Sequence, residues 1–260
     1  KNKILSILHS MYLTSEDINS LSYALMLKNA HIGLLGWVEE VVAELEVLAQ
    51  TNKDLAMMSR THGQPASPTT LGKELNVFLT RIKKEHTSLL ESKFYAKWGG
   101  ATANYNPHLL AFPDEDWVSH SKEFLKHLDI ELTVVATQIE PHDYMAELFQ
   151  NIQRINTIIL DLNRDIWTYI SLDYFSLKMS KNEVGSSTMP HKVNPIDFEN
   201  AEGNIGLSNA IFSHLSEKLP VSRLQRDLSD STVLRNIGTA YGYMEIAINS
   251  TLKGLGKLEA

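Results

Sequence analysis

The sequence of 260 residues contains no cysteine, which excludes a disulfide framework, a thiolate metal site and a cysteine nucleophile. It also lacks any apolar run approaching the roughly 20 residues that a membrane-spanning helix needs. Basic residues are outnumbered by acidic ones: the chain has 24 lysines and arginines and 31 aspartates and glutamates, which gives a net charge of −7. Nucleic acid is bound through basic surfaces. We therefore expect neither nucleic acid nor a membrane as a partner, and a reducing, cytoplasmic setting.

Apolar residues at helical spacing are abundant instead. Between Met145 and Ile170 they recur every three or four positions, and they do so again over residues 34–48 and 71–94. No convincing alternation of apolar and polar residues marks a strand. The eight prolines fall between these stretches or at their starts, where proline does least harm to a helix. The pattern predicts an all-α fold with helices at about residues 15–50, 68–97, 115–128, 140–175, 195–217 and 229–258.

Helix starts are predicted where an oxygen-bearing side chain precedes an apolar run, at residues 14–17, 67–68 and 229–230. A helix of about 30 residues is ~45 Å long, so several of them predict an elongated bundle. We assign residues 14–258 to this central bundle domain and residues 1–13 to the end of an N-terminal region. The extent of the apolar faces favours self-association through helices.

Four segments interrupt the helical pattern and are rich in functional groups. The most informative is residues 185–195 (GSSTMPHKVNP), where one glycine and two prolines disfavour a helix. Its hydroxyls, the ammonium group of Lys192 and the amide of Asn194 suit a site that binds a carboxylate and stabilises the charge it gains in an enolate-like transition state. The alternative is an ordinary polar loop.

The other three segments also have two interpretations each. Residues 59–65 (SRTHGQP) contain His62, which is either a surface histidine or a catalytic one. Residues 14–17 (TSED) form a helix cap, and a helix start can also bind an anion. Residues 223–235 would bring two guanidinium groups and a hydroxyl together, which suits a phosphate. Asp227 and Asp230 could instead pair with these arginines as salt bridges.

Together these segments resemble the fumarase/aspartase superfamily, whose signature loop SSxMPxKxNP stands complete at residues 186–195. Within the superfamily, the surrounding sequence looks like the bacterial type of adenylosuccinate lyases, and the resemblance runs through nearly the whole chain. The segments that carry it, in the order of that family, are TSEDIN at 14–19, SRTHGQPA at 59–66, TQIEPHDY at 137–144, GSSTMPHKVNPIDFEN at 185–200 and RDLSDSTVLRN at 226–236.

The resemblance implies a fold of three all-helical domains, of which this chain supplies mainly the central bundle. The N-terminal and C-terminal family domains are expected to be largely absent from these 260 residues. It further implies a homotetramer with shared active sites, and a reaction that requires no metal or organic cofactor. That reaction is the β-elimination of fumarate from adenylosuccinate to give AMP, and from succinyl-aminoimidazole-carboxamide ribotide, in purine nucleotide biosynthesis.

The resemblance also implies a role for individual residues. Ser186 would be the base that removes a proton from carbon, and His62 the acid that protonates the departing purine nitrogen. Lys192 and Asn194 would hold the substrate carboxylate. The remaining implied substrate-binding residues are Thr14, Ser15 and Gln138 for the succinyl arm and Arg226, Ser231 and Arg235 for the nucleotide.

Two other functions are compatible with parts of this pattern. Another lyase of the superfamily would share the signature loop, although TQIEPHDY and the arginine-rich segment favour the purine substrate. A non-catalytic scaffold on the same fold, like the lens crystallins related to argininosuccinate lyase, is disfavoured because His62 and Ser186 are both present.

Overall fold

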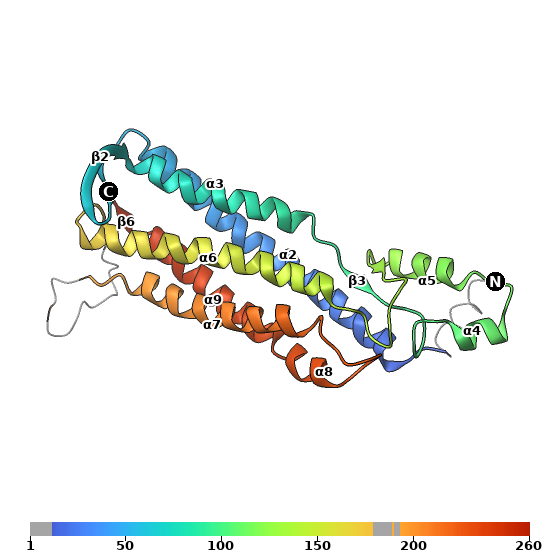
Figure 1. The fold of residues 1–260 in the computed structure, drawn as a ribbon. Coiled ribbons are helices and arrows are strands. Elements are labelled where there is room, and N and C mark those ends of the chain that lie inside the picture. The colour runs from blue at the N-terminus through green and yellow to red at the C-terminus, as the bar shows by residue number, and fades with distance from the viewer. Residues whose placement is uncertain (1–11, 179–188, 190–192) are drawn as a thin grey trace. The chain divides into compact units, whose positions relative to one another are not determined.

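The computed structural model describes residues 12–178, 189 and 193–260. The predicted site residues Ser186 and Lys192 lie outside the described residues. Helices dominate the described part of the chain, as Figure 1 shows, so the all-α prediction is confirmed. None of these helices is long and apolar enough to cross a membrane. Their bounds are α2 Ser15–Thr51, α3 Leu71–Leu90, α4 Asn106–Ala111, α5 Trp117–Lys126, α6 Asp143–Ser171, α7 Ile196–Lys218, α8 Ser229–Leu234 and α9 Ile237–Leu255.

Most predicted helices are present with ends shifted by a few residues. The helix expected at 229–258 is divided into α8 and α9 at Arg235–Asn236. The helix expected at 68–97 was predicted too long at both ends, since α3 begins at Leu71 and ends at Leu90. Helix α4 was not predicted, because six residues are too few to show a helical period.

The expectation that no strand is present was wrong. Strands β1 (Ala56–Thr61) and β2 (Gln64–Thr70) form an antiparallel hairpin between α2 and α3. The helix start predicted at residues 67–68 falls inside β2 and was therefore also wrong. Most side chains of both strands are exposed, so the sequence shows no alternation of apolar and polar residues there. Prolines are tolerated in β2 because a two-stranded hairpin has open edges.

Four further strands are only two residues long and join segments that are distant in sequence. Strand β3 (Tyr95–Ala96) pairs in parallel with β4 (Glu131–Leu132). Strand β5 (Ser176–Leu177) pairs in antiparallel fashion with β6 (Leu258–Glu259). They tie connecting segments to one another and do not form a sheet layer.

The chain divides into two compact units. Unit 1 consists of Lys1–Gly33, Glu91–Phe149 and His214–Arg235. Unit 2 consists of Leu34–Leu90, Gln150–Ser213 and Asn236–Ala260. Each unit is thus assembled from segments that are far apart in the sequence.

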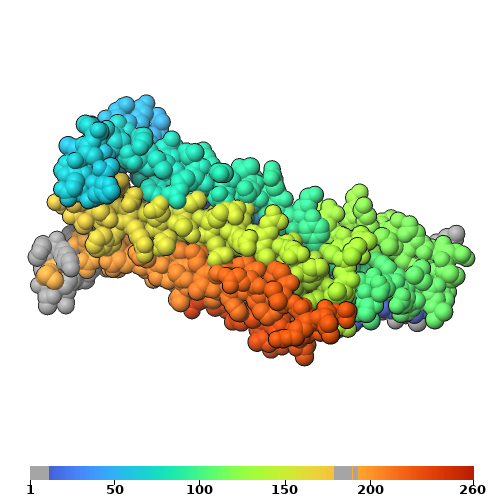
Figure 2. Space-filling model, in the orientation of Figure 1, coloured from blue at the N-terminus to red at the C-terminus, as the bar shows by residue number. Residues whose placement is uncertain are grey.

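Unit 2 is a helical bundle with an apolar interior. The α2 residues Val38, Val41 and Leu45 are fully buried, as are Ile155 and Ile159 of α6, at the spacing of one helix face. Toward solvent, ion pairs link neighbouring helices. Arg81 Nη1 of α3 lies 2.6 Å from an Asp161 oxygen of α6, and Arg164 Nη2 of α6 lies 2.6 Å from a Glu202 oxygen of α7. Figure 2 shows these three helices as adjacent bands on one face.

The end of α2 and the start of α3 touch through backbone at Gly72. A Cβ atom at this position would lie 2.2 Å from the Ala49 carbonyl oxygen, so no side chain fits. The Gly72 amide donates to the Asn52 oxygen at 2.9 Å, and the Leu71 amide donates to the Leu55 oxygen at 2.9 Å. These contacts fix the place where the hairpin leaves the bundle.

Candidate functional site

The first turn of α2 supplies Thr14 and Ser15. Thr14 precedes the helix, and its amide donates to an Asp17 carboxylate oxygen at 2.7 Å. A side chain three residues into the helix that bonds back to the capping residue is half of a capping box. The helix start predicted at residues 14–17 is therefore confirmed. It leaves the Ser15 side chain exposed and Thr14 half-buried.

A buried ion pair beneath this turn joins Asp17 to Lys97. Lys97 Nζ lies 2.9 Å from Asp17 Oδ1, and both side chains are 0% exposed. The same carboxylate oxygen accepts from the amides of Gly99 and Gly100 at 3.1 and 3.3 Å. Burial lowers the pKa of Lys97, and the charge of Asp17 opposes that effect. Sequence reasoning missed this pair, since Lys97 belongs to none of the recognised segments.

Arg226 meets the same turn of α2. Its Nη1 lies 2.5 Å from Glu16 Oε1, and the Arg226 side chain is 17% exposed. Asn19 Nδ2 also donates to this oxygen, at 2.8 Å. The alternative in which Asp227 pairs with Arg226 or Arg235 was wrong, because Asp227 binds Arg223 at 2.9 Å. Arg226 is thus held by a carboxylate of a different segment, beside Thr14 and Ser15.

Helix α8 carries Ser231 and ends beside Arg235. It begins at Ser229 as predicted, but its N-cap residue is Leu228, which makes no capping bond through its side chain. The Ser229 amide donates to Asp227 Oδ1 at 2.8 Å. The charge of Arg235 acts on Tyr23, a residue of α2. Burial raises the pKa of Tyr23, the Arg235 charge lowers it, and Asp230 and Glu16 add to the rise.

His142 lies between two carboxylates. Its Nδ1 is 3.5 Å from Glu140 Oε2 and its Nε2 is 3.8 Å from Asp230 Oδ2. The His142 residue is only 3% exposed. Burial by itself would lower the pKa of His142, but Asp230 and Glu140 outweigh burial and raise the pKa to about 9. Asp230 was expected to pair with an arginine as a surface salt bridge, and this was wrong, because it is buried against His142.

Gln138 lies in the same loop as His142, between β4 and α6. Its backbone amide donates to the Gln225 oxygen at 3.3 Å, which is one residue before Arg226. The loop of Gln138 therefore contacts the Arg226 segment twice, through this bond and through the His142–Asp230 pair. Unit 1 thus brings together the three segments that carry the predicted substrate-binding residues Thr14, Ser15, Gln138, Arg226, Ser231 and Arg235.

The charged state of His142 predicts a specific dependence of stability on pH. A group whose pKa is higher in the folded protein stabilises it fully below the unfolded pKa, near 6.5. That contribution is lost as the pH rises through about 9. Between pH 6.5 and 10 we expect the free energy of unfolding to fall by roughly 3 kcal/mol more in the wild type than in His142→Gln.

Urea unfolding at a series of pH values measures this difference. The exposed His127, at the end of α5, provides the control, because His127→Gln should leave the pH dependence of the wild type unchanged. Parallel curves for wild type and His142→Gln over this pH range would mean that His142 is not held as a cation.

The remaining predicted residues belong to unit 2 or lie outside the described part. His62 is exposed at the turn of the β1–β2 hairpin, where its φ is 55°. The following Gly63 has a φ of 74°, and Thr61 pairs with Gln64, so the turn has two residues, both with the positive φ of a type I′ turn. Asn194 is exposed two residues before α7. Ser186 and Lys192 lie outside the described residues.

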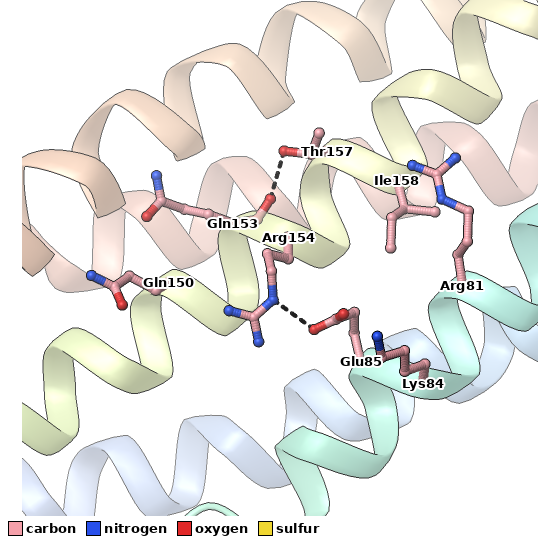
Figure 3. Close-up of a pocket in the computed structure, with 8 residues that line it drawn as sticks. All are labelled: Arg81, Lys84, Glu85, Gln150, Gln153, Arg154, Thr157 and Ile158. Carbon is pink, nitrogen blue, oxygen red and sulfur yellow. Dashed lines mark hydrogen bonds and ion pairs between the residues drawn. The ribbon is translucent and has the colours of Figure 1, made fainter.

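An open groove in unit 2 contains none of the predicted residues. Its volume is about 690 Å³. Figure 3 shows that the residues that line it come from α3 and α6. Three cations line it: Arg154 pairs with Glu85 at 2.7 Å, Arg81 pairs with Asp161 at 2.6 Å, and Lys84 is the third. Because none of the residues that the sequence predicts to be functional lies here, this groove is not the candidate site. Among residues 12–178, 189 and 193–260, no three histidine, aspartate or glutamate side chains converge on a possible metal position.

Comparison with known proteins identifies relatives. Residues 9–208 match the family described as Lyase, and residues 222–260 match the family described as Adenylosuccinate lyase C-terminal. A protein named adenylosuccinate lyase from Escherichia coli (strain K12) is 53% identical over 247 residues, which cover 95% of this chain and 54% of that protein. Its namesake from Legionella pneumophila (strain Corby) is 54% identical with the same coverage. The chain thus spans about half the length of the curated relatives it matches.

Solved structures share the fold at low sequence identity. The 3-carboxy-cis,cis-muconate lactonizing enzyme from Pseudomonas putida matches with a TM-score of 0.82 and 20% identity, covering 96% of this chain and 56% of its own. A fumarate lyase from Mesorhizobium sp. BNC1 matches with a TM-score of 0.78 and 17% identity, covering 95% and 55%. At this identity the likeness concerns the fold alone.

Proposed function

This chain belongs to the lyase family, in the fumarase/aspartase superfamily, and we propose that it is part of an adenylosuccinate lyase. The proposed enzyme eliminates fumarate from adenylosuccinate to give AMP, and from succinyl-aminoimidazole-carboxamide ribotide. The single observation that carries the proposal is the convergence in unit 1 of the α2 start, the Gln138 loop and the Arg226–Arg235 segment. Motifs that are distant in sequence can form one site only if the fold brings them together in this way.

The charges of unit 1 support an anionic substrate. Arg226 is already oriented by Glu16, so its remaining guanidinium donors are available in a fixed direction. Ser231 follows Asp230, whose carboxylate accepts from the Ser231 amide at 2.7 Å and faces His142. Arg226, Ser231 and Arg235 bind the nucleotide and its phosphate, while Thr14, Ser15 and Gln138 hold the succinyl arm.

The chemical step breaks a carbon–nitrogen bond. Ser186, as an alkoxide, takes the proton from the carbon beside the substrate carboxylate and becomes a neutral hydroxyl. The electron pair left behind forms the double bond of fumarate as the nitrogen departs. Lys192 and Asn194 stabilise the carboxylate while it carries the additional charge. His62 gives a proton to the departing nitrogen, a role that suits an imidazole near neutral pH. Atoms and charges balance without a further reactant.

We also propose a cytoplasmic homotetramer in which several subunits build each site. Residues 14–258 form the central helical domain in this proposal. Support comes from glycines inside long helices, each with open space where a Cβ would lie. Glycine in a helix costs about 1 kcal/mol relative to alanine, and the close approach of another helix would offset that cost. These glycines are Gly33 and Gly36 in α2, Gly203 and Gly206 in α7, and Gly238 and Gly242 in α9.

A panel of substrates tests the proposed activity in the full-length protein. Adenylosuccinate and succinyl-aminoimidazole-carboxamide ribotide should both release fumarate. Ultraviolet absorbance measures the rate of each reaction. Argininosuccinate, aspartate and fumarate should not react. Turnover of argininosuccinate or aspartate without turnover of either purine substrate would assign the chain to another lyase of the superfamily.

Two arginines of one segment provide a matched control. Arg226→Gln removes a half-buried charged donor, so the KM for adenylosuccinate should rise by about 10- to 100-fold. Arg223→Gln removes a guanidinium group that is 83% exposed and pairs with Asp227, so the KM should stay within twofold. Equal effects of the two substitutions would contradict the assigned role of Arg226.

A further inference from the structure

The hairpin that carries His62 has little packing of its own. Most side chains of β1 and β2 are exposed. A two-stranded hairpin is marginally stable by itself in water. The position of the two-residue turn at His62 and Gly63 therefore depends on contacts that anchor the hairpin to the rest of unit 2.

Tyr174 provides such an anchor. It lies between α6 and β5, in the same unit as the hairpin. Its hydroxyl donates to the Met58 carbonyl oxygen at 3.1 Å and accepts from Arg60 Nε at 3.3 Å. Both contacts are in β1, where the pairing register shifts between Met58 and Arg60. A shift of this kind redirects side chains along a strand, and here it accompanies the contact with Tyr174.

Arg60 continues this connection to the turn. Its Nη1 donates to the Gly63 carbonyl oxygen at 3.2 Å, in the residue directly after His62. Its guanidinium carbon lies 6.0 Å from the centre of the Tyr174 ring, within the range of a cation–π contact. One guanidinium group thus binds both the tyrosine and the turn.

Tyr174 is itself fixed by the end of α6. Asp173 has a φ of 59°, which turns the chain out of the helix. The Tyr174 amide then donates to the Tyr169 oxygen at 2.9 Å, and the two rings are 5.8 Å apart. Phe175 follows and is only 3% exposed. The hydroxyl that contacts β1 therefore belongs to a residue held by backbone and ring contacts at the end of α6.

We propose that Tyr174 and Arg60 are positioning residues that hold the His62 turn in place for proton transfer. This inference rests on the proposed function, in which His62 protonates the departing nitrogen. Neither residue touches the substrate in this proposal. A displacement of about 1 Å in a catalytic group can lower a rate by about 100-fold, so loss of the anchor affects turnover more than substrate binding.

The substitution Tyr174→Phe tests this in the full-length protein, because it removes the hydroxyl and keeps the ring. We expect kcat for adenylosuccinate to fall by about 10- to 100-fold, with KM within twofold of the wild type. Arg60→Lys keeps the charge but loses the two guanidinium donors that bind Tyr174 and Gly63, so it should lower kcat in the same way as Tyr174→Phe. Tyr243→Phe, at a half-buried position of α9, is the matched control and should keep the wild-type kcat.

A double variant separates positioning from a general structural effect. If Tyr174 acts through His62, then Tyr174→Phe should lower kcat no further once His62→Asn is present. Effects that multiply in the double variant would overturn the inference, as would a wild-type kcat in both Tyr174→Phe and Arg60→Lys. A wild-type protein without activity on adenylosuccinate would instead refute the proposed function, and this inference with it.

Discussion

Replacing Lys97 by methionine lowers the free energy of unfolding by about 3–5 kcal/mol, the usual effect of removing one partner of a buried ion pair. Asp17 would then remain as a carboxylate with 0% exposure that has lost its lysine partner. Its bonds from the amides of Thr14, Gly99 and Gly100 offset only part of that loss. Urea unfolding measures the change.

Two further variants identify the cause of that destabilisation. Lys28→Met removes a lysine whose partner Asp129 is 89% exposed, so its effect should stay below about 1 kcal/mol. Adding Asp17→Asn to Lys97→Met removes the uncompensated charge and should restore part of the lost stability. If Lys97→Met destabilises no more than Lys28→Met, the pair does not hold the first turn of α2.

Replacing Ser186 by alanine should lower kcat for adenylosuccinate by about 10²- to 10⁴-fold, the range associated with loss of a general base. Substrate binding should persist, because the nucleotide and succinyl contacts proposed in unit 1 do not involve this hydroxyl. The measurements are initial rates in the full-length protein and substrate binding by calorimetry. Ser88→Ala, on the exposed face of α3, is the control and should match the wild type. Near-normal turnover of Ser186→Ala would remove Ser186 from the role of base.

The long helices could be predicted because their periodicity is a local property. Helix α6 repeats apolar residues every three or four positions over its whole length, and most of those residues are buried. The β1–β2 hairpin could not be predicted in this way. Its exposed side chains show no period, and its turn depends on a histidine with positive φ, for which glycine or asparagine is the usual signal.

The contacts within the candidate site could not be predicted from short stretches of sequence. The motifs placed Thr14 and Arg226 in one function, but their connection runs through Glu16, which looks like an ordinary residue of a helix start. His142 stands in a recognised segment, yet its charge depends on Asp230, which comes much later in the chain. Sequence identifies such segments, while the pairing of buried charges requires the fold.

The assembly of unit 1 from three distant segments also sets an order of events during synthesis on the ribosome. Glu16 and Asp17 are synthesised long before the residues with which they pair. Lys97, the partner of Asp17, comes first. Arg226, the partner of Glu16, is made more than two hundred residues after Glu16. At about 5–20 residues per second, this second delay lasts on the order of 10 seconds or more. Over that interval Glu16 lacks its cation, so the segments that carry the proposed substrate-binding residues come together only near the end of translation of this region.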